Sequence, residues 1–283
     1  MRQRAKPLLG TLVEIRADCA DEALFVAATD AAFARVQHIH HVMSFHEASS
    51  DLQAIARCTA YEHVVVAVDT WNVLQLALEI ELSSEGHFNP TVAPALVHRQ
   101  LLPYPAGAGE APKRSTLAQS IVLDAPCIVR VLQPVWIDLG GIAKGYAVDA
   151  ATTALVEQGV AAGVVNAGGD LRVFGTAAQP IYVRHPANPG VQLAVANLQE
   201  LSCATSGGYL VPQSAIIGQR ANSALQHHSI TVIAPGCAVA DALTKVLWLA
   251  GIDSTIARAL LAKHDAQAVA LDVNGTATYG SGL

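Results

Sequence analysis

The chain has 283 residues, of which 52% are hydrophobic and only 14% are charged, and its formal net charge is −6 at pH 7. This composition is typical of a globular protein with a sizeable core and excludes an intrinsically disordered chain. The short basic stretch of Arg2, Arg4 and Lys6 is too small for a nucleic-acid footprint, so we do not expect nucleic acid as a partner. The five cysteines are scattered and form no CxxC pair, which predicts free thiols rather than disulfides or a zinc site.

The N-terminus carries no sign of a secretory signal. Residues 1–7 are charged and lack an apolar core, and no apolar run approaches the length of a membrane span. We therefore expect a cytoplasmic protein with no membrane span, or an exported one if a signal has been removed.

The first third of the chain predicts a strand and two helices. Alternating apolar and charged residues predict a strand over 11–17. Apolar residues at three- and four-residue spacing predict a long helix over 21–43, capped by Asp21. A second helix is expected over about 70–82, with Asp69 as its cap.

The rest of the chain mixes strands and helices irregularly. Residues 103–114 are rich in Pro, Gly and Ala, which is typical of an exposed loop. Strands in pairs with irregularly placed helices indicate an α+β fold with mostly antiparallel sheets and flanking helices. The further predicted elements are strands over 120–132, 136–141, 163–175 and 229–234, helices over 144–158, 239–250 and 253–264, and a hairpin over 268–280 that turns at Asn274–Gly275.

The most informative motif is IDLGGIAKGYAVD, residues 137–149. It brings Asp138 to a turn built from Gly140 and Gly141, and Lys144 opens the following helix. Backbone N–H groups at such a turn attract an anion, and Lys144 adds a positive charge, so a phosphate-bearing ligand is one interpretation. The other is a tight turn that needs glycine only for its conformation. Neither the P-loop spacing nor the GxGxxG spacing is present.

Other segments carry weaker signals. The glycine pairs in VNAGGD (165–170) and ATSGGY (204–209) permit close approach of a ligand, or simply a bulge in a strand. Asp241 lies on an apolar helix, where a carboxylate is costly unless it is paired or binds a cation. Lys245 shares its helix face, so an ion pair and a metal-bound phosphate both remain open. None of the eleven histidines has metal-ligand spacing, and no GxSxG motif occurs.

Six segments, in order along nearly the whole chain, together resemble the ApbE family of FAD:protein FMN transferases. The resemblance implies a single α+β domain over 1–283. It also implies FAD and Mg²⁺ as ligands, and a protein partner that carries a Thr-containing flavinylation motif. In the implied reaction the FAD pyrophosphate is cleaved and FMN is joined to that Thr through a phosphoester. The matching segments are PLLGTLVEI, MSFHEASSDL, GHFNPTVAPAL, IDLGGIAKGYAVD followed by VNAGGDLRVFG, ATSGGY, and SITVIAPGCAVADAL.

The resemblance also implies roles for individual residues. Metal binding falls on Asp241 and on the carbonyl of Gly141, and catalysis falls on Asp241 and Lys245. Flavin binding falls on Met43, His87, Phe88, Asn89, Asp138, Lys144, Ser206 and Ile216.

Three departures from the family pattern bear on the chemistry. Lys245 stands where the family usually has a metal-binding Thr, and Asn89 stands where it usually has Asp. The family's His-containing segment survives only as a trace over 215–222, with Ala215 at the His position. An ammonium at Lys245 could occupy the place of Mg²⁺, where it would bind phosphate but would not act as a Lewis acid.

Three functions therefore remain open. The first is the transferase. The second is a catalytically impaired flavin-binding carrier or sensor of the same fold, with Lys245 replacing Mg²⁺. The third is a structural or assembly partner whose site is empty. FAD binding separates the first two from the third, and AMP release with labelling of an acceptor separates the first from the second.

Overall fold

The computed structural model describes residues 1–124, 126–176, 178–188, 190–207 and 229–280. The chain forms two compact units. The first unit contains residues 1–37 and the described residues from 144 onward, and the second contains residues 38–143. The boundaries fall within helix α1 (Glu22–Met43) and at the start of helix α6 (Ala143–Glu157).

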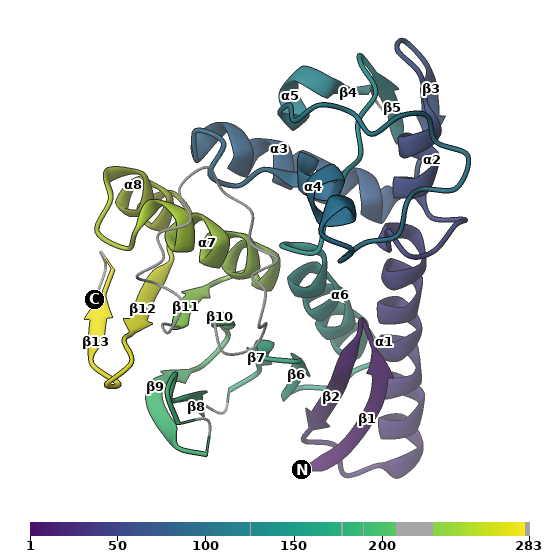
Figure 1. Cartoon of the computed structure of the whole chain (residues 1–283). Coiled ribbons are helices and arrows are strands. Elements are labelled where there is room, and N and C mark those ends of the chain that lie inside the picture. The colour runs from purple at the N-terminus through teal and green to yellow at the C-terminus, as the bar shows by residue number, and fades with distance from the viewer. Residues whose placement is uncertain (125, 177, 189, 208–228, 281–283) are drawn as a thin grey trace. The chain divides into compact units, whose positions relative to one another are not determined.

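The first unit is built on an eight-stranded sheet in which all neighbouring strands are antiparallel (Figure 1). Val13 and Ile15 of β2 are fully buried, as the alternation in the sequence predicts. In sheet order the strands are β1 (Arg2–Leu8), β2 (Thr11–Ala17), β6 (Gly163–Ala167), β7 (Asp170–Phe174), β10 (Ser202–Gly207), β11 (Ser229–Ala234), β12 (Gln267–Leu271) and β13 (Ala277–Tyr279).

Helices pack on one face of this sheet, and a β-hairpin packs on the other. Helix α7 (Cys237–Ala250) packs on β7, β10 and β11 and against helix α8 (Thr255–Lys263). The hairpin of β8 (Gln179–Arg184) and β9 (Gln192–Leu198) packs through Ile181 and Leu198 onto Cys203 of β10. Because neighbouring side chains of a strand point to opposite faces, Ser206 and Cys203 lie on opposite faces, and Ser206 lies on the α7 face.

The second unit combines short helices with a three-stranded antiparallel sheet in the order β3-β5-β4. Trp136 is almost fully buried among Phe45, Ala56 and Ala93 and forms part of its core. The elements are α2 (Asp51–Arg57), β3 (His63–Val65), α3 (Val68–Ser83), the 3₁₀ turn η1 (Pro90–Val92), α4 (Ala93–His98), α5 (Leu117–Ser120), β4 (Ile121–Asp124) and β5 (Ile128–Val131).

The α+β class and the antiparallel sheets with flanking helices are confirmed. Asp21 caps α1, since its carboxylate accepts hydrogen bonds from the backbone N–H groups of Ala23 at 2.8 Å and Leu24 at 3.3 Å. Gly159, with a φ of +88°, follows α6 where the sequence predicts its end. Residues 103–114 contain neither helix nor strand, as expected of a loop.

The predicted start of α3 is wrong. The helix begins at Val68, so Asp69 lies in its first turn and does not cap it. Asp51 of α2 fixes this end instead, because its carboxylate accepts hydrogen bonds from the Ala67 N–H at 2.9 Å and from the Thr70 hydroxyl at 2.6 Å. This carboxylate is 16 residues away in sequence, so a local capping pattern does not reveal it.

Two further expectations need correction. Residues 136–141 were predicted as a strand, but the structure has none there. Trp136 and Ile137 are apolar because they are buried, and not because they pair in a sheet. The last hairpin turns through a longer loop than a two-residue turn at Asn274–Gly275. Asp272 organises this loop by accepting hydrogen bonds from the backbone of Asn274 and Thr276, both at 2.8 Å.

The described part of the chain contains no helix that is long and apolar enough to cross a membrane.

The cysteines are free thiols, as predicted, and two of them lie in the core. Cys203 and Cys237 are at most 1% exposed, and burial raises the pKa of Cys203 to about 12 and that of Cys237 well above its usual range. We expect a thiol reagent at pH 8 to spare both in the native protein and to label all five cysteines after denaturation. A Cys203→Ser/Cys237→Ser variant should keep the native labelling count, and a drop in that count would contradict the prediction.

Candidate functional site

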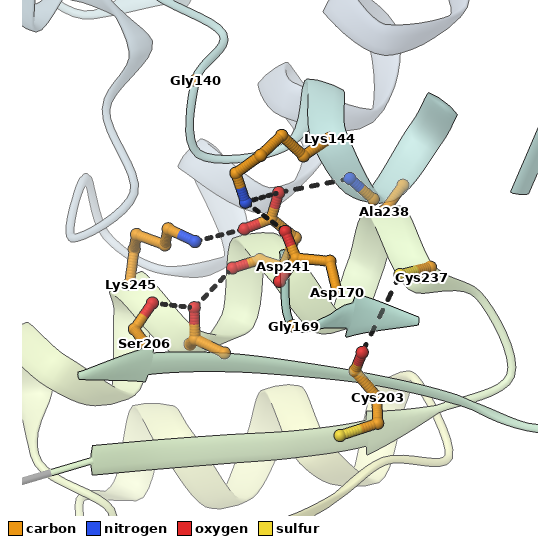
Figure 2. A network of polar contacts seen from close by, with 12 residues as sticks. Gly140, Lys144, Gly169, Asp170, Cys203, Ser206, Cys237, Ala238, Asp241 and Lys245 are labelled. Carbon is orange, nitrogen blue, oxygen red and sulfur yellow. Dashed lines mark hydrogen bonds and ion pairs between the residues drawn. The ribbon is translucent and has the colours of Figure 1, made fainter. Parts of the chain in front are cut away.

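Four charged side chains from three elements of the first unit meet in one cluster (Figure 2). We call Lys144 of α6, Asp170 of β7 and Asp241 and Lys245 of α7 the Lys–Asp cluster. Lys144 forms an ion pair with Asp170, and its Nζ lies 3.8 Å from Oδ2 of Asp241. Lys245 forms an ion pair with Oδ1 of Asp241 from one turn further along α7.

The acids of the cluster are buried, whereas the lysines reach solvent. The side chains of Asp170 and Asp241 are 3% and 0% exposed, but those of Lys144 and Lys245 are 35% and 20% exposed. A buried carboxylate is costly without a paired charge, so the lysines are needed to stabilise the two acids. The cluster therefore offers ammonium groups, and not carboxylates, to an incoming ligand.

The pKa shifts agree with this charge pattern. Burial tends to lower the pKa of Lys144, but Asp241 and Asp170 outweigh it, so its pKa lies above the usual range. Burial tends to raise the pKa of Asp241, but Lys144 and Lys245 outweigh it and lower the pKa below its usual value. For Asp170, burial and the charge of Asp241 raise the pKa. Lys144 is therefore cationic and Asp241 anionic at neutral pH.

Close packing of α6 on α7 places Asp241 in the cluster. Gly145 of α6 donates its backbone N–H to Oδ2 of Asp241 at 3.3 Å. A Cβ at Gly145 would lie 2.2 Å from the carbonyl oxygen of Cys237, so glycine is needed for this approach. Asp149 accepts hydrogen bonds from the backbone N–H groups of Cys237 at 2.9 Å and Ala238 at 3.0 Å, and so satisfies the start of α7.

Hydroxyl groups extend the cluster along the α7 face of the sheet. The hydroxyls of Ser206 on β10 and Thr244 on α7 form a hydrogen bond of 2.8 Å. Thr244 also donates to the backbone carbonyl of Asp241 at 2.7 Å. Ser206, a predicted flavin-binding residue, is thereby connected to Asp241 through Thr244, and both lie on the face that carries the Lys–Asp cluster.

The arrangement suits the binding of an oxygen-rich anion. The two partly exposed ammonium groups are donors of the kind that phosphate oxygens accept from. The comparison with known proteins agrees with the family resemblance seen in the sequence. The ApbE family matches residues 9–271. The chain belongs to the ApbE family.

Two curated relatives carry the same name. The chain is 27% identical to the FAD:protein FMN transferase of Treponema pallidum over 90% of this chain and 80% of the relative. It is 25% identical to the FAD:protein FMN transferase of Haemophilus influenzae over 78% of this chain and 72% of the relative.

Solved structures of ApbE proteins share the fold. The ApbE protein of Thermotoga maritima matches with a TM-score of 0.80 and 24% identity, over 99% of this chain and 97% of that chain. The flavin transferase ApbE of Vibrio cholerae matches with a TM-score of 0.79 and 22% identity, over the same shares of the two chains. At these identities the likeness shows the fold alone.

Within the first unit, the structure brings four predicted site residues together: Lys144, Ser206, Asp241 and Lys245. It also adds Asp170, which is not among the residues predicted from the sequence. The signal was present in the sequence, since Asp170 directly follows the glycine turn of VNAGGD at the start of a strand. Its partner Lys144 is 26 residues away, and only the fold brings the two together.

Other predicted site residues belong to the second unit and have local partners there. His87 Nδ1 lies 2.8 Å from the Ser84 carbonyl oxygen, and the Phe88 N–H donates to the Ser84 hydroxyl at 3.0 Å. Asp138 accepts a hydrogen bond from the Gly140 N–H at 3.2 Å, so it holds the predicted glycine turn. Met43, at the end of α1, is buried, Gly141 lies in the turn before α6, and Ile216 and residues 215–222 lie outside the described residues.

Asn89 uses its amide in the local structure. Its Oδ1 accepts hydrogen bonds from the N–H of Thr91 at 2.7 Å and from the Thr91 hydroxyl at 2.8 Å, and its Nδ2 donates to the Ser115 carbonyl at 2.9 Å. A carboxylate could accept the first two but could not donate the third. We expect Asn89→Asp to lower the free energy of unfolding by about 1–2 kcal/mol in urea denaturation. The exposed Asn197→Asp is the control, and equal effects at both positions would contradict this role.

The family resemblance implies a divalent cation at Asp241, but the Lys–Asp cluster does not fit one. A magnesium site needs several oxygen ligands with free lone pairs. Here one oxygen of Asp241 faces the Lys245 ammonium, and the other faces Lys144 and the Gly145 N–H. Within the described ranges, no three His, Cys, Asp or Glu side chains are grouped to hold a metal ion. Metal binding by Asp241 and Gly141 stays a prediction.

Proposed function

We propose that this chain is an FAD:protein FMN transferase that attaches FMN to a Thr of a target protein. Membership of the ApbE family over residues 9–271 is the observation that carries the proposal. The names of the curated relatives, which match along most of this chain, support it. The Lys–Asp cluster adds a physical reason, because its two ammonium groups suit a pyrophosphate.

The reaction is a displacement at phosphorus. The hydroxyl oxygen of the acceptor Thr forms a bond to the flavin-side phosphorus of FAD, and that phosphorus loses its bond to the oxygen it shares with AMP. AMP leaves with the electron pair, and the proton of the hydroxyl passes to solvent. Lys144 and Lys245 would neutralise the charge on the phosphates, while Asp241 positions both ammonium groups.

The residues that bind the flavin are a further prediction of this proposal. Flavin binding is still assigned to Met43, His87, Phe88, Asn89, Asp138, Lys144, Ser206 and Ile216. Each can be tested by one substitution and a flavin titration.

The decisive experiment combines FAD, the purified protein and an acceptor protein with a Thr-containing flavinylation motif. One of the curated relatives, assayed on the same acceptor, provides the positive control. We expect AMP release in step with a mass increase of one FMN on the acceptor, and neither product with a Thr→Ala acceptor. FAD binding without AMP release would overturn the proposal in favour of the carrier or sensor. Absence of FAD binding would leave the structural or assembly partner.

A further inference from the structure

The Lys–Asp cluster has no excess of negative charge that an added cation would have to neutralise. Asp170 and Asp241 carry at most two negative charges, since burial and Asp241 raise the pKa of Asp170, and Lys144 and Lys245 carry two formal positive charges. Both acids are at most 3% exposed, so they meet their counter-charges inside the protein and not in solvent. A divalent cation added beside Asp241 would have to displace the Lys245 ammonium or lie in contact with it. Two positive charges in contact repel each other.

The two lysines can nevertheless bind an anion. An ammonium has three N–H donors, so contacts to carboxylates do not exhaust them. Both side chains are partly exposed, whereas the acids beneath them are not. The total charge of the two ammonium groups equals that of one Mg²⁺ ion, and the Asp pair fixes their positions before a ligand arrives.

We propose that Lys245 takes the place of a divalent cation, and that Lys144 and Lys245 together bind the pyrophosphate of FAD without metal. This inference rests on the proposed function for the identity of the ligand. It identifies Lys245 as a residue that contacts substrate, and Asp241 as the residue that positions Lys245. It also gives Lys245 a role different from that of the metal-binding Thr that the family resemblance implies at this position.

The first test needs no variant. The full-length protein is freed of metal and titrated with FAD in EDTA and then in Mg²⁺, while flavin fluorescence is measured. We expect the same Kd in both buffers, with an affinity that falls as salt is raised, because the contacts are between charges. Binding that is lost in EDTA and restored by Mg²⁺ would overturn the proposal.

Variants at position 245 give the second test. Lys245→Met should raise the Kd for FAD by roughly tenfold or more, the effect of losing one charge-assisted hydrogen bond. Lys245→Arg should retain most of the affinity, whereas Lys245→Thr should bind weakly in EDTA and more tightly in Mg²⁺. Lys263→Met is the matched control, because it removes an exposed lysine from α8 of the same unit. Thermal unfolding of each variant shows that it is folded.

The outcomes distinguish this inference from the proposed function. Metal-independent FAD binding without AMP release would support the inference and overturn the transferase. AMP release that requires Mg²⁺, together with Mg²⁺-dependent binding, would support the transferase and overturn the inference. Equal FAD affinity in Lys245→Met and the wild type would overturn the role of Lys245, and absence of FAD binding would overturn both proposals.

Discussion

Gly145→Ala is expected to lower the free energy of unfolding by about 3 kcal/mol, a typical cost of overpacking a core. The new Cβ would lie 2.2 Å from the carbonyl oxygen and 2.6 Å from the carbonyl carbon of Cys237, and 2.8 Å from Cα of Ala238. These are backbone atoms, so no side-chain rotation relieves the clash, and α6 and α7 must separate. Denaturant unfolding measures the change.

The expected destabilisation by Gly145→Ala is opposite in sign to the usual effect of this substitution in a helix. Glycine to alanine inside an unconstrained helix stabilises a protein by about 1 kcal/mol, because alanine has the higher helix propensity. Thr153→Ala, at an exposed position of the same helix, is the control and should be neutral or slightly stabilising, because alanine has the higher helix propensity. If Gly145→Ala were neutral or stabilising, the close approach of α6 to α7 would be contradicted. We also expect Gly145→Ala to weaken FAD binding, because the Gly145 N–H donates to Asp241 and a shift of α6 would disturb that contact.

Removing the charge of Asp241 is expected to cost about 3 kcal/mol of stability, as is usual when one member of a buried ion pair is lost. Asp241→Asn keeps the size of the side chain, but leaves Lys144 and Lys245 with one carboxylate between them. FAD affinity should fall as well, since the two ammonium groups lose the acid that positions them. Urea unfolding and flavin titration measure the two effects.

A double-mutant cycle isolates the contact with Lys245. The variants are Asp241→Asn, Lys245→Met and the two combined, all unfolded in the absence of FAD. We expect the double variant to be less destabilised than the sum of the single variants by at least about 0.5 kcal/mol, because both remove the same ion pair. Additive effects would contradict the pairing of Asp241 with Lys245. The half-buried pair of Arg130 and Asp124, whose side chains are more exposed than those of the Lys–Asp cluster, supplies a control cycle with a smaller coupling.

The fold was predictable where the pattern in the sequence is local. Strand β2 covers Thr11–Ala17, β11 covers Ser229–Ala234 and α1 ends at Met43, as predicted. The apolar residues of β2 and α1 recur at the period of their own element, which is set by backbone geometry alone. Strand β11 is instead a short, largely apolar segment that is buried along its whole length. The start of α3 was mispredicted because Asp51, a distant residue, fixes it.

In the candidate site, too, contacts between residues close in sequence were predictable and contacts between distant residues were not. The ion pair of Asp241 and Lys245 was open to prediction, since residues four apart on a helix share a face. The role of Asp149 was not, because its partners at the start of α7 are 88 and 89 residues away.

The sequence alone determined the family, the α+β class, the glycine turns and the residues that depart from the family pattern. It left two interpretations of Asp241, a simple ion pair or a metal-bound phosphate. The tertiary structure added Asp170 and Lys144 to the pair, and showed that the acids are buried while the lysines reach solvent. The physical reason is that burial and pairing depend on which elements pack together, and residues 144, 170 and 241 meet only when α6, β7 and α7 do.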